Sequence, residues 1–274
     1  KVMFHKITFC VSEKKLKTKK ILDFFENIVF EKKNKYWQVQ IITSNYSRDL
    51  KFLNLIFRIK KYQCVEISKK NWVLSTFQKD RPVKTNFFTI SQNQLKITST
   101  KNFLKIPAST AFGTGKHFST LLIIKNIEWL SKKKKFFSFL DLGTGTGILA
   151  FVLVKIYQKK IIATDIDNES EKCVNLNKRI NAINNVFFVK CRDFHTSYLN
   201  RKKFDLIVSN LLLSPLKKNV VNFCRYLKSG GFVIVSGILK SQVNDMISHY
   251  GKFNLKLVKY NYISDWISII FKKL

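Results

Sequence analysis

Three glycines at alternate positions, Gly143, Gly145 and Gly147, form the part of this chain whose residue types point most directly to chemistry. They follow an apolar run that ends in Asp141, and a helical pattern begins at Ile148, so the segment is predicted to fold as strand, tight turn and helix. Glycine lets the backbone turn sharply and lets a ligand approach without a Cβ in the way. The start of the helix adds unpaired N–H groups and the positive end of its dipole. We therefore expect an electron-rich ligand at this turn.

The spacing of the glycines decides between classes of ligand. A dinucleotide-binding turn requires G-x-G-x-x-G, and Ile148 stands where the last of these glycines would be. A P-loop is excluded as well, because His117 follows Gly115-Lys116 and Thr110 stands at the position of the first glycine. The pattern that is present, D-x-G-x-G-x-G, is the form expected of S-adenosylmethionine-dependent methyltransferases. The alternative is a glycine-rich turn that holds no ligand.

Acidic residues follow the next two predicted strands, at the edge of the sheet where a ligand would lie. Asp165 ends the second strand, where a carboxylate can accept hydrogen bonds from both hydroxyls of a ribose, and Asp167 follows closely. Asp193 comes just after the third strand, where it can accept a hydrogen bond from the amino group of an adenine, with Phe194 packed nearby. A solvated strand end for Asp165 and an ordinary surface turn for Asp193 are the alternatives.

Asn210 ends the fourth predicted strand, where amine-methylating enzymes place an Asn or Asp whose oxygen receives the target N–H. A lysine ammonium has a pKa of about 10.4 and no lone pair. Transfer of a methyl group from a sulfonium therefore needs the neutral amine, held in line with that group. An uncharged acceptor can orient the amine, and a dry pocket lowers its pKa. Asn210 is predicted to be catalytic; the alternative is an asparagine that merely ends a strand.

The elements that must position these residues alternate regularly from residue 135 onward, which predicts a parallel sheet with right-handed crossovers. The first strands are predicted over Phe136–Asp141, Lys160–Asp165, Val186–Lys190, Phe204–Ser209 and Gly231–Ser236. A closing pair is predicted over Leu255–Asn261 and Trp266–Phe271, with the last strand antiparallel. The fold class is therefore α/β, a seven-stranded Rossmann-like methyltransferase domain.

The N-terminal third has no glycine and no motif of its own, and it reads as a recognition or packing module. Its patterns predict strands over His5–Ser12, Tyr36–Thr43 and Cys64–Ile67 and helices over Glu13–Asn27 and Arg48–Ile59. This order predicts a small α+β, ferredoxin-like domain over residues 1–66. A lysine-rich linker is predicted over residues 67–84, and the methyltransferase domain over residues 85–274.

The chain carries 50 basic and 17 acidic residues, a formal net charge of +33. Such a charge attracts nucleic acid or another polyanion. A compositional bias of the genome explains it equally well, because lysine far outnumbers arginine, the residue that specific phosphate recognition favours. Both explanations stay open. No apolar run is long enough to span a membrane, and the histidines and cysteines lack the spacing of metal ligands. We expect a cytoplasmic protein with no metal site and no membrane contact.

Several motifs together make the chain resemble the PrmA family, the ribosomal protein L11 methyltransferases. The motifs are Ala111-Phe112-Gly113-Thr114-Gly115-x-His117-x-x-Thr120, Asp141 to Ala150, Asp165-Ile166-Asp167, Asn210-Leu211-Leu212, Pro215-Leu216 and Ser236-Gly237-Ile238-Leu239. The first and the last of them are more specific than the glycine turn. The similarity runs from Trp72 to the end of the chain, and the N-terminal third matches only in size and order of elements. Lys116 and Phe118 depart from the family's pattern, which leaves the shape of their loop open.

The resemblance implies an enzyme that transfers methyl groups from S-adenosylmethionine to lysine side chains and to the N-terminal amine of ribosomal protein L11. It implies that the N-terminal domain recognises the substrate, that Phe112, Gly113 and Thr114 form a loop over the cofactor, and that Thr120 contacts the cofactor. With the residues above, the predicted cofactor site consists of Phe112, Gly113, Thr114, Thr120, Asp141, Gly143, Gly145, Gly147, Asp165, Asp193 and Asn210. Ribosomal protein L11 is the expected partner of a monomeric enzyme, with transient contact to the ribosome or its RNA.

His117 has two interpretations. It can serve as a base for the proton of the departing ammonium, since its pKa lies near neutrality, or it can be a structural residue that closes the loop over the methionine end of the cofactor. Two other functions also stay open. The net charge favours an RNA methyltransferase, although Leu211 and Leu212 cannot stack on a base. A non-catalytic binding protein with the same fold is opposed by the presence of every glycine of the turn and of Asp165.

Overall fold

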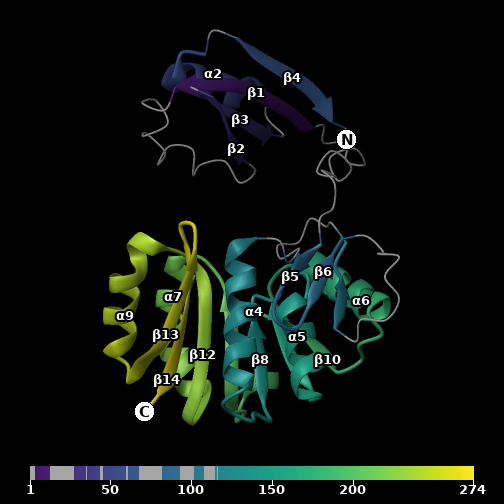
Figure 1. Cartoon of the computed structure of the whole chain (residues 1–274), viewed down its shortest axis with the longest axis vertical. Helices are drawn as coiled ribbons and strands as arrows, with labels where there is room; N and C mark the ends of the chain where they lie inside the picture. The colour runs from purple at the N-terminus through teal and green to yellow at the C-terminus, as the bar shows by residue number, and fades with distance from the viewer. Residues whose placement is uncertain are drawn as a thin grey trace. The chain divides into compact units, whose positions relative to one another are not determined.

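The computed structural model describes residues 4–12, 28–34, 36–43, 46–59, 61–67, 82–92, 102–107, 115 and 117–274. The chain divides into two compact units, Lys1–Lys79 and Asp80–Leu274, and each is considered by itself (Figure 1). Most of the predicted linker lies outside the described residues. Its last two residues, Val83 and Lys84, form a short strand that pairs within the second unit.

The N-terminal unit is an antiparallel sheet in the order β2-β3-β1-β4. Its strands are β1 (Phe4–Ser12), β2 (Ile28–Lys33), β3 (Tyr36–Thr43) and β4 (Tyr62–Ile67), and helix α2 spans Tyr46–Phe57. Leu53 and Phe57 of α2 pack with Ile7 and Phe9 of β1 in a buried cluster. This strand order agrees with the predicted ferredoxin-like domain. The predicted helix Glu13–Asn27 lies outside the described residues. Strand β2 was not predicted, because its sequence passes from apolar to charged residues without alternating.

The second unit is built on a seven-stranded sheet in the order β10-β9-β8-β11-β12-β14-β13. The strands are β8 (Phe139–Leu142), β9 (Ile161–Asp165), β10 (Val186–Lys190), β11 (Phe204–Asn210), β12 (Leu227–Leu239), β13 (Leu255–Ile263) and β14 (Trp266–Lys273). Strand β14 runs antiparallel to both of its neighbours, β12 and β13. The predicted α/β fold and its antiparallel last strand are thereby confirmed.

Helices cover both faces of this sheet. The first group is α4 (Phe118–Ser131), α5 (Ile148–Tyr157) and α6 (Asn168–Ile180), and the second is α7 (Leu213–Lys218), α8 (Val220–Tyr226) and α9 (Val243–Gly251). Side chains alternate between the faces of a strand. Phe139 of β8 therefore packs in the cluster under α4 and α5, whereas Leu140 and Leu142 pack in the cluster under α7 to α9. Figure 1 shows α4 and α5 beside β8, and α9 beside β13. None of the described helices is long and apolar enough to cross a membrane.

A small three-stranded sheet, β5 (Val83–Lys84), β6 (Thr89–Ser91) and β7 (Phe103–Lys105), packs against the first group of helices. A buried carboxylate fixes it there. Glu128 of α4 accepts hydrogen bonds from the N–H groups of Asn86, at 3.2 Å, and Phe87, at 3.0 Å, and from the hydroxyl of Thr85. The turn between β5 and β6 is thus held by a side chain of the first long helix.

Candidate functional site

A cavity of about 660 Å³ opens at the carboxyl ends of the central strands. It is lined by residues that the sequence had predicted from separate loops: Gly143 and Gly145 of the β8–α5 turn, Asp165 at the end of β9, Asp193 after β10, Asn210 at the end of β11, and His117 before α4. The carboxyl edge of a doubly wound sheet is where ligands of such folds lie. The fold therefore brings six of the twelve predicted site residues to one cavity.

The glycine turn is held against strand β9. The N–H groups of Gly143 and Thr144 both donate to the carbonyl oxygen of Thr164, at 2.9 Å each. Gly143 has φ +73°, and a Cβ on it would lie 2.7 Å from Cδ2 of Leu211. A larger residue would therefore strain the backbone and collide with Leu211, which itself lines the cavity. The turn leaves bare backbone facing the cavity.

The carboxylate of Asp165 is fixed by two backbone N–H groups. Its Oδ2 accepts from Gly145 at 2.9 Å, and its Oδ1 accepts from Asp167 at 3.0 Å. Each carboxylate oxygen has room for a second hydrogen bond. The side chain lines the cavity, so its remaining acceptor positions suit a pair of hydroxyl groups on a ligand.

Asp193 lines the cavity after β10, with φ +54°. Its Oδ1 accepts a hydrogen bond from Nδ2 of Asn219 at 2.8 Å, which holds the side chain in place. Phe194 does not reach the cavity, contrary to the expectation that it would pack beside an adenine. It is buried and stacks on Tyr226, with the ring centroids 4.8 Å apart. Its apolar ring contributes to the core below α8, whereas Asp193 lines the cavity.

Asn210 is the most informative residue of the cavity. Its Nδ2 donates to Oγ1 of Thr120 at 3.1 Å, while its Oδ1 is buried and has no hydrogen-bond partner. Leaving a buried acceptor unpaired costs about 1–3 kcal/mol, and such atoms are uncommon in native proteins. A side chain at Gly237 would press on this Oδ1 and overlap the carbonyl oxygen of Leu211, so the close approach requires glycine. The site thus presents an amide oxygen that a ligand donor can satisfy.

His117 caps helix α4. Its Nδ1 accepts from the N–H of Ser119 at 3.3 Å and lies 2.7 Å from the hydroxyl oxygen of Ser119. Its ring meets Trp266 edge-on, with the centroids 4.5 Å apart. Burial lowers the pKa of His117, which favours the neutral ring at neutral pH. These contacts match the structural interpretation of His117, because Nδ1 is committed to the start of the helix that carries Thr120.

Three of the predicted cofactor-binding residues lie beneath the cavity and do not line it. Thr120 supports Asn210 as described, and Gly147 is the N-terminal cap residue of α5. Asp141 is completely buried, and its Oδ2 accepts from Oγ1 of Thr144 at 2.6 Å and from the N–H of Ala150 at 3.1 Å. Burial raises the pKa of Asp141 to about 7, in spite of these hydrogen bonds. Phe112, Gly113 and Thr114 lie outside the described residues.

Sequence reasoning missed Trp266, Arg192 and Gly237, which also line the cavity. Trp266 is the first residue of β14, and because this strand is antiparallel its start lies at the carboxyl edge. The predicted direction of the last strand was therefore a signal that could have placed Trp266 in the site. Gly237 stood in a recognised motif without a role. Nothing in the sequence around Arg192 distinguishes it from other basic residues.

Taken together, the cavity offers bare backbone, a fixed carboxylate for hydroxyl groups, a second carboxylate and an unpaired amide oxygen. These groups suit the nucleoside part of a ligand at one end and an N–H donor at the other. The donor set contains oxygen acceptors and aromatic or apolar walls, and it offers little positive charge for phosphate. A nucleoside cofactor without phosphates, such as S-adenosylmethionine, fits this chemistry.

Comparison with known proteins points the same way. The chain matches the family described as Ribosomal protein L11 methyltransferase (PrmA) over residues 7–274. A protein of Agrobacterium fabrum named ribosomal protein L11 methyltransferase is 31% identical over 207 residues, which are 74% of this chain and 71% of that protein. A protein of Rhizobium rhizogenes with the same name is 32% identical over 203 residues, 73% of this chain and 70% of that protein.

Solved structures agree with these relatives. The ribosomal protein L11 methylase of Lactobacillus delbrueckii subsp. bulgaricus matches with a TM-score of 0.60 at 26% identity, over 70% of this chain and 99% of that chain. A methyltransferase of Pyrococcus furiosus matches with a TM-score of 0.50 at 20% identity, over 62% of this chain and 89% of that chain. The second match concerns the fold alone.

Proposed function

The chain belongs to the ribosomal protein L11 methyltransferase (PrmA) family, and on that premise we propose that it transfers methyl groups from S-adenosylmethionine to lysine side-chain and N-terminal amines of ribosomal protein L11. The observation that carries the proposal is the unpaired, buried Oδ1 of Asn210 at the cavity. An amine substrate is a donor that would complete this hydrogen bond. The reaction is expected in the cytoplasm, with the enzyme acting as a monomer.

Asn210 would act on the amine as an acceptor. A lysine side chain must lose its proton before it can attack, because its ammonium form has no lone pair. An amide oxygen carries no formal charge, so it does not stabilise the ammonium form as strongly as a carboxylate would. By accepting one N–H of the neutral amine, Oδ1 fixes the direction of its lone pair. The hydrogen bond from Nδ2 to Thr120 keeps the amide from rotating.

The cofactor would be held by residues on the other side of the cavity. Asp165 would accept hydrogen bonds from the ribose hydroxyls, and Asp193 from the amino group of the adenine. Gly143 and Gly145 would allow close approach of the backbone. When bound, S-adenosylmethionine supplies an electrophilic methyl group on a sulfonium. The fixed carboxylate of Asp165 and the shape of the turn support this assignment.

His117 is assigned a positioning role. Its Nδ1 caps α4, and this helix presents Thr120 to Asn210. The lowered pKa of His117 keeps the ring neutral over the pH range in which the substrate amine loses its proton. The proton of the ammonium would leave to water before the amine enters the site, so no residue needs to act as its base.

The test is incubation of the full chain with methyl-labelled S-adenosylmethionine and purified ribosomal protein L11. Label should appear in lysine residues and at the N-terminus of that protein, and the Asp165→Ala variant should need a higher cofactor concentration. No label in ribosomal protein L11, in the presence of measurable cofactor binding by calorimetry, would refute the substrate. Label that ribonuclease releases from total ribosomes would instead support an RNA methyltransferase.

A further inference from the structure

The charge of the second unit is unevenly distributed along the direction of its strands. Carboxylates gather at the carboxyl edge, where Asp165, Asp167, Asp193 and Asp265 lie at or just after strand ends. The opposite, amino edge is formed by the segments that precede β8, β9, β11, β12 and β13 and by the end of β14. Exposed cations crowd these segments: Lys132, Lys133, Lys134, Lys135, Lys159, Lys160, Arg201, Lys203, Lys228, Lys252 and Lys272.

The two carboxylates near the amino edge are already engaged. Glu128 is buried and accepts hydrogen bonds from residues 85–87. Asp205 binds Lys228 at 2.8 Å and accepts hydrogen bonds from residues 137 and 138. No described carboxylate forms an ion pair with Lys132–Lys135, Lys159 or Lys160. Cations such as Lys190 and Arg192 also lie at the carboxyl edge, but carboxylates accompany them there, whereas described cations outnumber carboxylates at the amino edge. The amino edge is therefore a surface that fits a polyanion.

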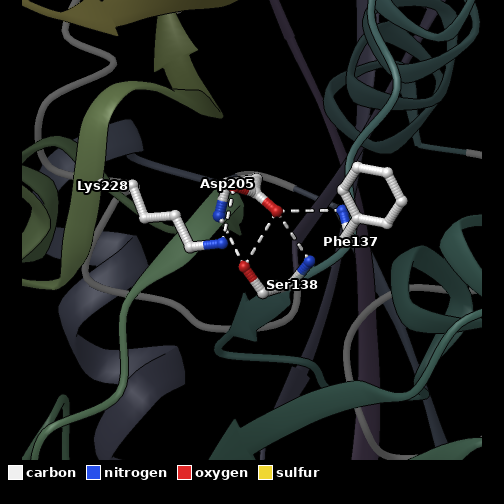
Figure 2. A network of polar contacts seen from close by, with 4 residues as sticks. All are labelled: Phe137, Ser138, Asp205 and Lys228. Carbon is white, nitrogen blue, oxygen red and sulfur yellow. Dashed lines mark hydrogen bonds and ion pairs between the residues drawn. The ribbon is translucent and has the colours of Figure 1, made fainter.

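Aromatic rings lie among these lysines and make one continuous strip. Strand β9 lies between β10 and β8 in the sheet, so Lys159 and Lys160, just before β9, lie between Phe187 of β10 and Phe137 before β8. The ammonium of Lys160 lies 5.2 Å from the ring centre of Phe187, and that of Lys159 lies 5.7 Å from the ring centre of Phe137. Phe137 is 65% exposed, and its ring points away from Asp205 (Figure 2). We call Lys132–Lys135, Phe137, Lys159, Lys160 and Phe187 the amino-edge strip.

We propose that the amino-edge strip binds single-stranded RNA, at the opposite end of the sheet from the methyl-transfer site. Lysines supply point charges that follow a phosphate backbone without reading its sequence. The exposed rings supply faces on which unpaired bases can stack. The choice of RNA over DNA rests on the proposed function, because a ribosomal protein substrate is found beside RNA. The strip would hold the enzyme near its substrate while leaving the cavity open.

The test is fluorescence anisotropy of the full chain with a labelled single-stranded RNA of mixed sequence, about 20 nucleotides long, in about 50 to 200 mM salt. The triple variant Lys134→Glu/Lys159→Glu/Lys160→Glu should weaken binding at least about tenfold and reduce the slope of log affinity against log salt by about 2.

The matched control is Lys125→Glu/Lys190→Glu/Lys218→Glu, which changes the net charge equally at exposed positions outside the strip. Its affinity should fall much less. Phe137→Ala should weaken binding about fivefold or more by removing a stacking face.

Three outcomes would overturn the proposal. Equal losses in the two triple variants would mean that the affinity reports net charge alone. The strip would be a membrane contact if the parent protein sedimented with phosphatidylglycerol vesicles, the triple variant of the strip did not, and neither bound RNA. Stronger competition by single-stranded DNA than by RNA would contradict the assignment to RNA. The assay contains no cofactor and no ribosomal protein, so its result is independent of whether methyl transfer is observed, and thermal unfolding of each variant confirms that it is folded.

Discussion

Strand β11 has a polar side chain near each end, Asp205 and Asn210, and the two differ in how many of their hydrogen-bonding atoms have a partner. At the amino edge, Oδ2 of Asp205 accepts from the N–H groups of Phe137 and Ser138 at 2.9 Å and from the hydroxyl of Ser138 at 3.0 Å, and Oδ1 meets Lys228 (Figure 2). At the carboxyl edge, Asn210 keeps a buried oxygen without a partner. The carboxylate of Asp205 thus finds its hydrogen-bond and ion-pair partners within the protein, whereas Oδ1 of Asn210 can still accept a hydrogen bond from a ligand.

Two buried or partly buried carboxyl groups repeat this contrast. Burial raises the pKa of Asp205, but Lys228 and the hydrogen bonds from Phe137 and Ser138 outweigh it, so the pKa lies below its usual value. Asp141, under the glycine turn, forms no ion pair with a described cation, and burial raises its pKa to about 7. The unpaired Oδ1 atoms of Asn210 and Asp141 therefore lie at or under the cavity, whereas the fully paired carboxylate of Asp205 lies at the opposite edge of the sheet.

The largest effect is expected from a substitution of Asn210, at the carboxyl end of β11. Asn210→Ala removes the acceptor that would orient the amine, and we expect kcat to fall by about 10²–10³, the range for loss of one preorganised hydrogen-bonding group in an active site. Affinity for S-adenosylmethionine, measured by calorimetry, should change far less. The free energy of unfolding should fall by about 1 kcal/mol, because the hydrogen bond from Nδ2 to Thr120 is lost, whereas Oδ1 makes none. An unchanged kcat would remove Asn210 from the mechanism.

A substitution of Asp205, at the amino end of β11, should lower the stability and leave kcat almost unchanged. Asp205→Ala leaves two backbone N–H groups and Lys228 without their acceptor, and we expect a loss of about 2–3 kcal/mol in the free energy of unfolding. The kcat of the protein that remains folded should stay within about twofold, because Asp205 lies at the other end of β11. Asp205→Asn keeps an acceptor and should cost less than half as much. Urea titrations give the stabilities; a large fall in kcat with intact stability would contradict the contrast.

Two glycines, one at the cavity and one away from it, separate an effect on cofactor binding from an effect on stability. Gly143 at the cavity and Gly230 in the irregular first part of β12 have nearly equal φ, +73° and +72°, but of the two only Gly143 has a close neighbour for a Cβ. At Gly230 the nearest atom, Cε of Lys272, is 4.0 Å away. Both Gly→Ala variants should lose about 1 kcal/mol of stability from backbone strain. Gly143→Ala alone should weaken cofactor binding, by about tenfold, since Leu211 is displaced into the cavity. Equal cofactor affinities would refute this role of the turn.

The buried carboxyl group of Asp141 should make the stability depend on pH. The pKa of Asp141 is raised in the folded state to about 7 from its ordinary value of 3.8, so the folded protein binds more protons between these values than the unfolded chain does. Its contribution to stability is complete below the lower value and is lost as pH rises through about 7. Asp141→Asn cannot ionise and mimics the protonated form. Its stability relative to the parent should therefore rise by up to about 1.4 kcal/mol per pH unit between pH 5 and 7, and then level off.

The measurement is chemical denaturation of both proteins at pH 5, 6, 7 and 8. The difference between the two curves removes the contribution of Asp205, whose pKa is shifted in the opposite direction. If the difference in the free energy of unfolding were constant across this range, Asp141 would have to stay ionised in the folded protein. Its Oδ1 would then have a further partner, in addition to Thr144 and Ala150, which bind Oδ2.

The sequence predicted the large sheet and the position of its cavity for a simple physical reason. Apolar strands followed by glycine or acidic residues are local patterns, and a parallel sheet collects their ends at one edge. Local patterns could not predict which atoms stay unpaired. The hydrogen bond between Asn210 and Thr120 joins residues far apart in the chain, and the burial of Asp141 depends on α5 packing over it. Phe194 was misplaced for the same reason, because its ring is drawn into a core that includes Tyr226.

The position of β14 also affects how the protein is made. This strand lies between β12 and β13 in the sheet but follows both of them in the chain. During synthesis β13 therefore emerges before its neighbour β14 exists, and the wall of the cavity formed by Trp266 is among the last parts of the sheet to appear. A nascent chain paused before residue 266 would contain the glycine turn and Asn210 and still lack a finished pocket. The cavity is thus completed only after the start of β14 has been synthesised.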